Sequence, residues 1–200
     1  MPAARETLLD AAHVAVRSRP WSVVRMVDVA AAAGVSRQTL YNEFGSKEGL
    51  GAALVERVLE DFLDGAARAA AEACRSGHAP AGCCAAAARW VLRTARTEPI
   101  VGAALTGCLE TRMPLPTRTA PGKLAAALHG RVVSGLEEAR RVPVGGPLRE
   151  DFDRGEVERA YEVGLRVALS YVVAPLQGPG DEEPCGRVDE VVRALLAHQA

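Results

Sequence analysis

The sequence predicts an all-α protein of about nine helices, and three observations support this fold class. Apolar residues recur at spacings of three and four along nearly the whole chain, as in helices that bury one face. Alternating β-branched runs joined by hairpin dipeptides are missing. Turn residues divide the chain into segments of helical length. We expect a three-helix N-terminal unit over residues 1–46 and a second helical unit over residues 47–200.

Composition restricts the class of protein further. The chain is 48% hydrophobic and 24% charged, and it has no long uninterrupted apolar run, which indicates a globular protein with no membrane partner. Residues 1–20 carry Glu6 and Asp10 among their apolar positions and so do not resemble a secretory signal, which predicts a cytoplasmic protein. The net charge of −1 gives no global argument for nucleic-acid binding. Any such argument must rest on where individual charges lie.

The first three helices are expected to be short. An amphipathic helix with apolar positions at Leu8, Leu9, Ala12 and Val16 should end before Pro20, because proline disfavours helical geometry in the preceding residue. A second helix over residues 26–33 should stop at Gly34, a residue suited to a left-handed C-terminal position. Ser36 is suited to cap a third helix that runs to about Phe44.

Longer helices should make up the rest of the chain. Ser46 is expected to cap a fourth helix that reaches about Cys74, and a fifth and a sixth should cover residues 83–96 and 100–111. A proline-rich loop then precedes a seventh helix over about residues 123–141. The eighth should span about residues 155–174, and the ninth should follow a loop at 177–186.

The second and third helices form a helix-turn-helix pattern. The segment "AGVS" (33–36) separates them, and its glycine permits the sharp turn. We expect one side of this pair to face the core, through Ala32, Val35, Leu40 and Phe44. The opposite side should then carry Arg37, Gln38, Tyr41 and Asn42.

These residue types match the chemistry of the DNA major groove, which admits a single α-helix. Arginine can donate two hydrogen bonds to guanine, and Asn and Gln can pair with adenine, so Arg37, Gln38 and Asn42 are candidates for base contacts. Hydroxyls and a lysine nearby are placed to contact phosphates, at Ser36, Thr39, Tyr41 and Lys47. Lys47 also opens the fourth helix, whose positive dipole end favours anions.

The segment "DVAAAAGVSRQTLYNEFGSKEGL" (28–50) resembles the DNA-binding signature of the TetR family of bacterial transcriptional regulators. The resemblance is close over residues 5 to about 60 and agrees elsewhere in helix number and chain length. It implies phosphate contacts from Thr39, Tyr41 and Lys47 and base contacts from Arg37, Gln38 and Asn42. Arg25 replaces the usual capping Ser or Thr and could reach a phosphate. Val27 and Glu43 also depart from the family pattern, which puts the operator sequence in question.

The resemblance further implies a homodimer that binds a palindromic operator, acts as a repressor and is released by an unidentified small-molecule effector, with no cofactor. Helices four to seven would enclose the effector, and helices eight and nine would pair between subunits. Candidate pocket residues are Trp90, Leu105, Cys108, Leu109, Met113, Leu128, His129 and Val132, although several also fit an ordinary core. Candidate dimer contacts are Leu165, Leu169, Val172, Val188, Val192 and Leu195.

The sequence leaves three other classes of function as alternatives to this interpretation. An enzyme is not expected, because no catalytic triad, phosphate-binding glycine loop or metal-ligand cluster is visible. A thiol-based redox sensor is suggested by Cys83 and Cys84, but neighbouring helical residues point about 100° apart and are poorly placed to bridge each other. A helical interaction or scaffold protein that has lost DNA binding is the remaining alternative.

Overall fold

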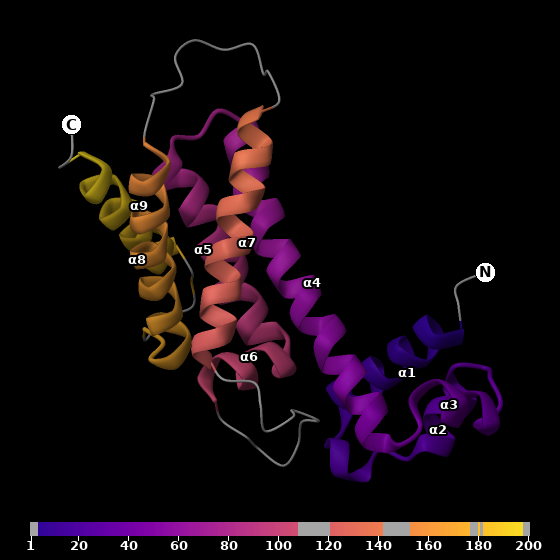
Figure 1. The fold of residues 1–200 in the computed structure, drawn as a ribbon. Coiled ribbons are helices and arrows are strands. Elements are labelled where there is room, and N and C mark those ends of the chain that lie inside the picture. The colour runs from indigo at the N-terminus through magenta and orange to yellow at the C-terminus, as the bar shows by residue number, and fades with distance from the viewer. Residues whose placement is uncertain (1–3, 108–120, 142–152, 177–179, 181, 198–200) are drawn as a thin grey trace.

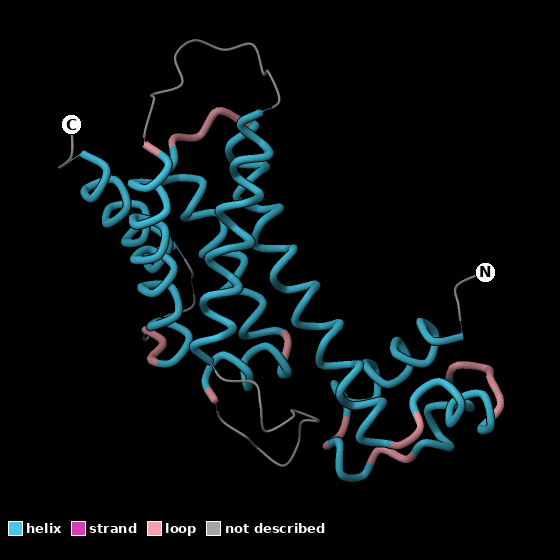
Figure 2. Tube along the Cα trace, in the orientation of Figure 1, coloured by secondary structure: helices cyan, strands magenta, loops and turns pink. Residues whose placement is uncertain are grey.

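The computed structural model describes residues 4–107, 121–141, 153–176, 180 and 182–197, and every long regular element in them is an α-helix (Figure 2). The expected all-α class is therefore confirmed. The helices, in chain order, are α1 (Ala4–Ser18), the short 3-10 helix η1 (Trp21–Val23), α2 (Met26–Ala32), α3 (Arg37–Phe44), α4 (Lys47–Arg75), α5 (Pro80–Thr97), α6 (Pro99–Thr106), α7 (Pro121–Arg141), α8 (Arg154–Val173) and α9 (Glu182–Ala197).

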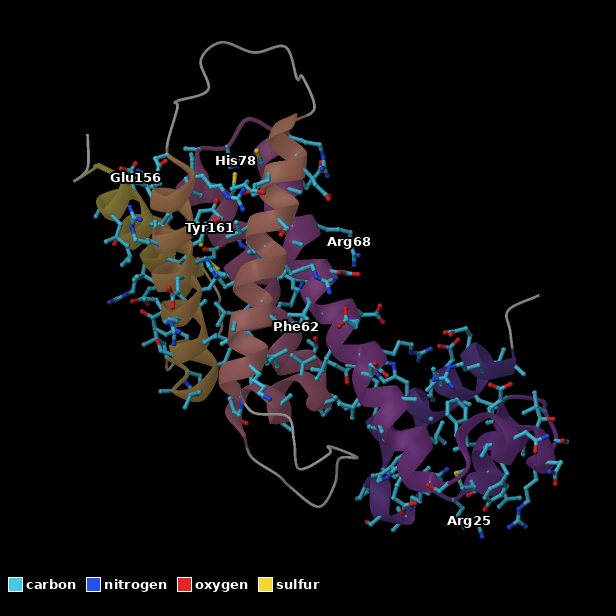
Figure 3. The ribbon with its side chains drawn as sticks, in the orientation of Figure 1. Arg25, Phe62, Arg68, His78, Glu156 and Tyr161 are labelled. Atoms are coloured by element: carbon cyan, nitrogen blue, oxygen red, sulfur yellow. The ribbon has the colours of Figure 1, made fainter. Side chains whose placement is uncertain are left out.

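Helix α4 connects the two ends of the molecule. Figure 1 shows α1, α2 and α3 gathered around the first turns of α4, while α5, α6 and α7 pack on its later turns and α8 and α9 lie on the far side of the bundle. Leu50 and Leu54, in the early turns, are fully buried in the same apolar cluster as Leu8 of α1 and Leu40 of α3. Phe62, further along α4, is buried at the start of the larger bundle (Figure 3). The fold thus places a small three-helix unit at one end of a long helix.

Local sequence signals define the ends of the short helices. The Ser36 hydroxyl accepts a hydrogen bond from the Thr39 amide at 3.0 Å, and the Ser46 hydroxyl accepts one from the Gly49 amide at 3.1 Å. Both serines therefore cap the helices that they were expected to open. Gly34 and Gly45 have φ angles of 67° and 70°, which side chains rarely adopt. The turn between α2 and α3 depends on the first of these glycines.

Tyr161 fixes α8 against the beginning of α5. Its side chain is fully buried and its hydroxyl donates to the carbonyl oxygen of Pro80 at 2.6 Å (Figure 3). Gly164 lies one turn later, where an added Cβ would overlap Val192 of α9. A buried phenol with a bonded hydroxyl and a glycine at the closest approach allow α8 to pack on two helices at once.

Three boundaries differ from the expectation. Helix α5 begins at Pro80, three residues earlier than the sequence predicted. Helix α6 ends at Thr106, before left-handed Gly107 (φ 69°), so it is shorter than the sequence predicted. Helix α9 begins at Glu182, although Pro184 and Cys185 were assigned to a loop. The first turn of a helix needs no intrahelical N–H donors, so it tolerates Pro184 there.

Candidate DNA-binding interface

Helix α3 separates an apolar side from a polar side. Leu40 has no exposed surface, and Val35 and Phe44 are half-buried against the same core. Ala32 was also expected to face the core, but it is exposed, because the buried side of α2 carries Val29 and Ala30 instead. The opposite side of α3 carries the exposed polar residues Arg37, Gln38 and Asn42.

Side chains on this polar surface contact one another along the helix. The Gln38 amide nitrogen Nε2 donates to Asn42 Oδ1 at 2.9 Å, one turn further on. The Arg37 guanidinium lies over the ring of Tyr41, 5.5 Å from its centroid. Such contacts restrict the rotamers of long side chains before a partner arrives, which lowers the entropy lost on binding.

Ser36 and Thr39 are partly used within the helix end. Besides accepting from the Thr39 amide, the Ser36 hydroxyl lies 2.8 Å from the Thr39 hydroxyl. Ser36 is exposed and Thr39 is half-buried. The capping role of Ser36 is therefore structural, and any contact with a phosphate would use the remaining capacity of the two hydroxyls.

Lys47 is held in place by a segment 25 residues earlier in the chain. Its ammonium donates to the carbonyl oxygen of Ser22 at 3.1 Å and lies over the ring of Trp21, 5.4 Å from the centroid. Glu48, the next residue, has a pKa below its usual value, because its own backbone amide and then the Ser46 hydroxyl donate to the carboxylate. The start of α4 therefore stabilises negative charge beside an oriented lysine.

Arg25 is held by a neighbouring acid. Its Nε and NH2 groups donate to the two carboxylate oxygens of Asp28 at 2.9 and 2.8 Å, and it provides no side-chain cap for α2 (Figure 3). The hydrogen bond from Arg25 lowers the pKa of the Asp28 carboxyl. The other two residues that depart from the family pattern are both on the surface, with Val27 46% exposed and Glu43 also exposed.

Two polar contacts of the N-terminal helices could not be predicted from the sequence. Trp21 lies in η1, an element that apolar periodicity does not reveal, yet it supports Lys47. His13 of α1 contacts Glu98, which is 85 residues away in the chain. Long-range pairs of this kind follow from the packing of helices and not from local patterns.

The predicted effector residues lie in different surroundings in the described part of the chain. Leu128 and Val132 of α7 have no exposed surface, and Leu105 of α6 is also buried. His129 is half-buried and its Nε2 lies 2.9 Å from the carbonyl oxygen of Glu158 in α8, which joins two helices. Three further candidates lie outside the described residues, namely Cys108, Leu109 and Met113.

Trp90 lies apart from those core residues. It lines an open groove of about 670 Å³ between α4, α5 and α9, whose wall includes none of the other described pocket candidates. Its indole N–H donates to the carbonyl oxygen of Phe62 at 3.0 Å, and the Arg93 guanidinium lies 5.4 Å from its ring centroid. Gly65 provides the space for the ring, because an added Cβ would overlap it. These contacts give Trp90 a packing role between α4 and α5.

Half of the predicted dimer contacts are buried within the single chain. Leu165, Val188 and Val192 are 2% exposed or less and pack in the protomer's own core, so they have no surface to offer a partner. Helices α8 and α9 pack on each other and on α5, which uses these positions within one chain. Leu169, Val172 and Leu195 are half-buried and keep exposed apolar area. Val173 and Leu176 add further apolar surface, at 65% and 43% exposed.

The adjacent cysteines are poorly suited to redox chemistry. Cys83 and Cys84 are 1% and 0% exposed. Burial raises the pKa of the Cys84 thiol far above its usual value, and the charges of Cys83 and Asp189 act in the same direction. Since the thiolate is the reactive form, neither burial nor charge favours oxidation at Cys84.

None of the helices in the part of the chain that the structure describes is both long and apolar enough to cross a membrane. In the same residues, no group of three or more His, Cys, Asp or Glu side chains could hold a metal ion.

The N-terminal unit is similar to the DNA-binding part of a known protein family. Residues 8–54 match the family model described as bacterial regulatory proteins, tetR family. The HTH-type transcriptional regulator AlkX of Mycobacterium tuberculosis is 45% identical over 60 residues, which is 30% of this chain and 28% of that protein. This relative is therefore matched over less than a third of its length.

Solved structures match the whole fold. The TetR family repressor AlkX from Dietzia sp. strain DQ12-45-1b, implicated in biodegradation of n-alkanes, is 26% identical, with a TM-score of 0.61 over 98% of this chain and 95% of that one. Thermus thermophilus FadR, a TetR family transcriptional repressor in complex with lauroyl-CoA, is 21% identical, with a TM-score of 0.54 over 96% and 93% of the two chains. The second likeness concerns the fold alone.

Proposed function

The chain belongs to the TetR family of bacterial transcriptional regulators, and from that premise we propose that it is a homodimeric repressor that binds a palindromic operator and is released by a small-molecule effector. It would act in the cytoplasm, where its DNA is. Residues 1–46 would form the DNA-binding unit and residues 47–200 the unit for effector binding and dimerisation, with α4 common to the cores of both.

The polar surface of α3 is the observation that carries the proposal. Leu40 anchors one side of the helix in the core while Arg37, Gln38 and Asn42 stand exposed on the other. We assign base contacts to these three residues, because guanidinium and amide groups match the hydrogen-bonding edges of guanine and adenine. The bond between Gln38 and Asn42 would present two amides to the groove as one unit.

Phosphate contacts would fix α3 in register. We assign them to Thr39, Tyr41 and Lys47, with Ser36 as a weaker contributor because it caps the helix. Arg25 would join them only by giving up part of its ion pair with Asp28. These contacts would contribute affinity for any DNA and little sequence preference.

Dimerisation would use the outer surface of α8 and α9. Leu169, Val172 and Leu195 form its half-buried part, and the exposed side chains of Val173 and Leu176 extend it. A two-fold axis there would set two copies of α3 about 34–36 Å apart, which is one turn of DNA. Such a dimer requires an operator with matching two-fold symmetry.

The AlkX relatives suggest which effectors to test first. Because the Dietzia protein is implicated in n-alkane biodegradation, we propose n-alkanes and their oxidation products as the first compounds to screen. An apolar ligand would have to enter the middle helices, where Leu128 and Val132 are closed to solvent in this structure. Binding would therefore require α6 or α7 to move, and only differential affinity for the two arrangements could release DNA.

A fluorescence-anisotropy titration tests the proposal. The purified protein is titrated against DNA flanking its own gene at about 50 and 200 mM salt, where several phosphate contacts should cost about 10³–10⁵ in affinity. Tight, salt-sensitive binding to a palindrome supports the proposal. If the protein binds neither this DNA nor any sequence from a randomised DNA pool, the scaffold alternative replaces the proposed function.

A further inference from the structure

Glu98 occupies the corner between two helices of the bundle. It follows the last residue of α5 and precedes the first residue of α6. Its amide donates to the carbonyl oxygen of Thr94 at 2.8 Å, and its carbonyl oxygen accepts from the Gly102 amide at 3.0 Å. The residue is only 8% exposed. Its backbone is therefore fixed by both α5 and α6.

The Glu98 side chain contacts α1 and does not cap α6, the helix that it directly precedes. It makes no capping hydrogen bond to α6. Instead, Oε2 lies 2.8 Å from His13 Nε2 and 3.8 Å from an Arg17 guanidinium nitrogen, both on α1. In the described part of the chain, Oε1 is buried and has no hydrogen-bond partner. The carboxylate thus belongs to the bundle, while its polar partners belong to the DNA-binding unit.

Electrostatics makes this contact depend on the position of α1. Burying a carboxylate is costly unless it is paired and hydrogen-bonded. Here the compensation comes from His13 and Arg17, so Glu98 loses it if α1 moves away. One turn before His13, α1 is also bound to α4, because Arg57 donates to Asp10 at 2.7 Å. Helix α1 is therefore tied both to its own unit and to the bundle.

We propose that Glu98, with His13 and Arg17, is a polar joint that fixes the position of the DNA-binding unit relative to the α5–α6 corner. The joint restricts how far α1 can move when α6 is displaced. A dimer in which both joints are intact presents its two copies of α3 with less freedom, so that less entropy is lost on the operator. This last consequence rests on the proposed function, whereas the joint itself does not.

Hydrogen exchange tests the joint without DNA. The variants are His13→Ala, Glu98→Gln and the double variant, in the full-length protein. Alanine is the best helix former and His13 is partly exposed, so the first variant should fold. Loss of a hydrogen bond to a charged group should speed exchange of α1 amides about tenfold or more, while α7 amides remain protected. The α1 amides of the double variant should exchange no faster than those of the more affected single variant.

Glu72→Gln is the matched control. It makes the same chemical change in an exposed ion pair with Arg75 at the far end of α4. This variant should exchange like the wild-type protein. The proposal is overturned if α1 exchange in His13→Ala and Glu98→Gln matches that of the control, or if the two effects simply add.

Operator titrations of the same variants test the functional consequence. We expect each joint variant to bind operator about three- to tenfold more weakly, with an unchanged dependence on salt, because no phosphate contact is removed. Unchanged operator affinity together with faster α1 exchange would refute the link to DNA while retaining the joint. A wild-type protein that binds no DNA would refute the proposed function, and the exchange data would still decide on the joint.

Discussion

Lys47 and Ser22 are joined by a hydrogen bond, in which the lysine ammonium donates to the serine carbonyl oxygen at 3.1 Å. The bond and the adjacent Trp21 ring orient the ammonium before any phosphate is present. Helix α4 therefore begins with a cation whose position is set by residues that precede α2.

Replacing Lys47 with alanine should weaken binding to operator and to unrelated DNA by similar factors. Loss of one phosphate contact should also lower the slope of log K against log salt by about 0.9. Anisotropy titrations over a salt series measure both effects. Lys123→Ala, at an exposed position of α7, removes the same charge far from α3 and should leave the slope unchanged. Equal slopes for the two variants would remove Lys47 from the phosphate contacts.

Alanine at Gln38 or at Asn42 should cost about 1–3 kcal/mol in operator binding and little in binding to scrambled DNA, because these amides are assigned to base edges. Since the two side chains share a hydrogen bond, the double variant should lose less than the sum of the single losses. Competition titrations with operator and scrambled duplexes provide the comparison. Losses of equal size on both duplexes would reassign the pair to backbone contacts.

The Arg25–Asp28 pair predicts a measurable dependence on pH. The hydrogen bond from Arg25 lowers the pKa of Asp28 in the folded protein. The contribution of the pair to stability is therefore present above the unfolded-state pKa and is lost as the pH falls through the lower folded-state pKa. NMR titration of the carboxyl carbon should show the low pKa in the wild type and a return toward the usual value in Arg25→Ala. An Asp28 pKa unchanged by this substitution would contradict the assignment.

Cys84 should resist thiol reagents in the folded protein, because burial removes access and raises its pKa. Labelling by a disulfide reagent, followed by mass spectrometry, should find Cys84 modified only after unfolding, while half-buried Cys74 reacts earlier. Operator affinity should also be unaffected by peroxide. Rapid labelling of Cys84 in the native protein would restore the redox-sensor alternative.

Gly65→Ala should destabilise the protein by about 1–3 kcal/mol, because the new methyl group would displace the Trp90 ring that bonds to Phe62. Gly130→Ala, at an exposed position of α7 with no atoms near the added methyl, should instead stabilise by about 0.5–1 kcal/mol through helix propensity. Urea unfolding monitored by fluorescence measures whether each variant is less or more stable than the wild type. Similar midpoints for both variants would show that Trp90 can be displaced at little cost.

Local signals account for what the sequence predicted well. Ser36 and Ser46 mark helix starts because a short hydroxyl side chain can satisfy a nearby amide, and this chemistry needs no tertiary information. Gly34 marks the turn for a similar reason, through its positive φ. The polar surface of α3 follows from helical periodicity once Leu40 is placed in the core.

Tertiary packing decided what the sequence left open. An apolar stripe on α8 or α9 shows that a surface is buried, but not whether its partner is the same chain or another copy. Leu165 and Val192 turned to their own core, while Leu169 and Leu195 remained partly exposed. The Glu98 contact was equally inaccessible, because His13 carries no local sign of a partner 85 residues away.

The length of α4 has a mechanical consequence. Its 29 residues, at about 1.5 Å each, form a rod of about 44 Å whose early turns lie in the three-helix unit and whose later turns lie in the bundle. A tilt of about 5° about one end would move the other by nearly 4 Å, which exceeds the 3.4 Å rise between successive base pairs. A small change of tilt at the Arg75 end of α4 is thus enough to move α3 by the distance between successive base pairs.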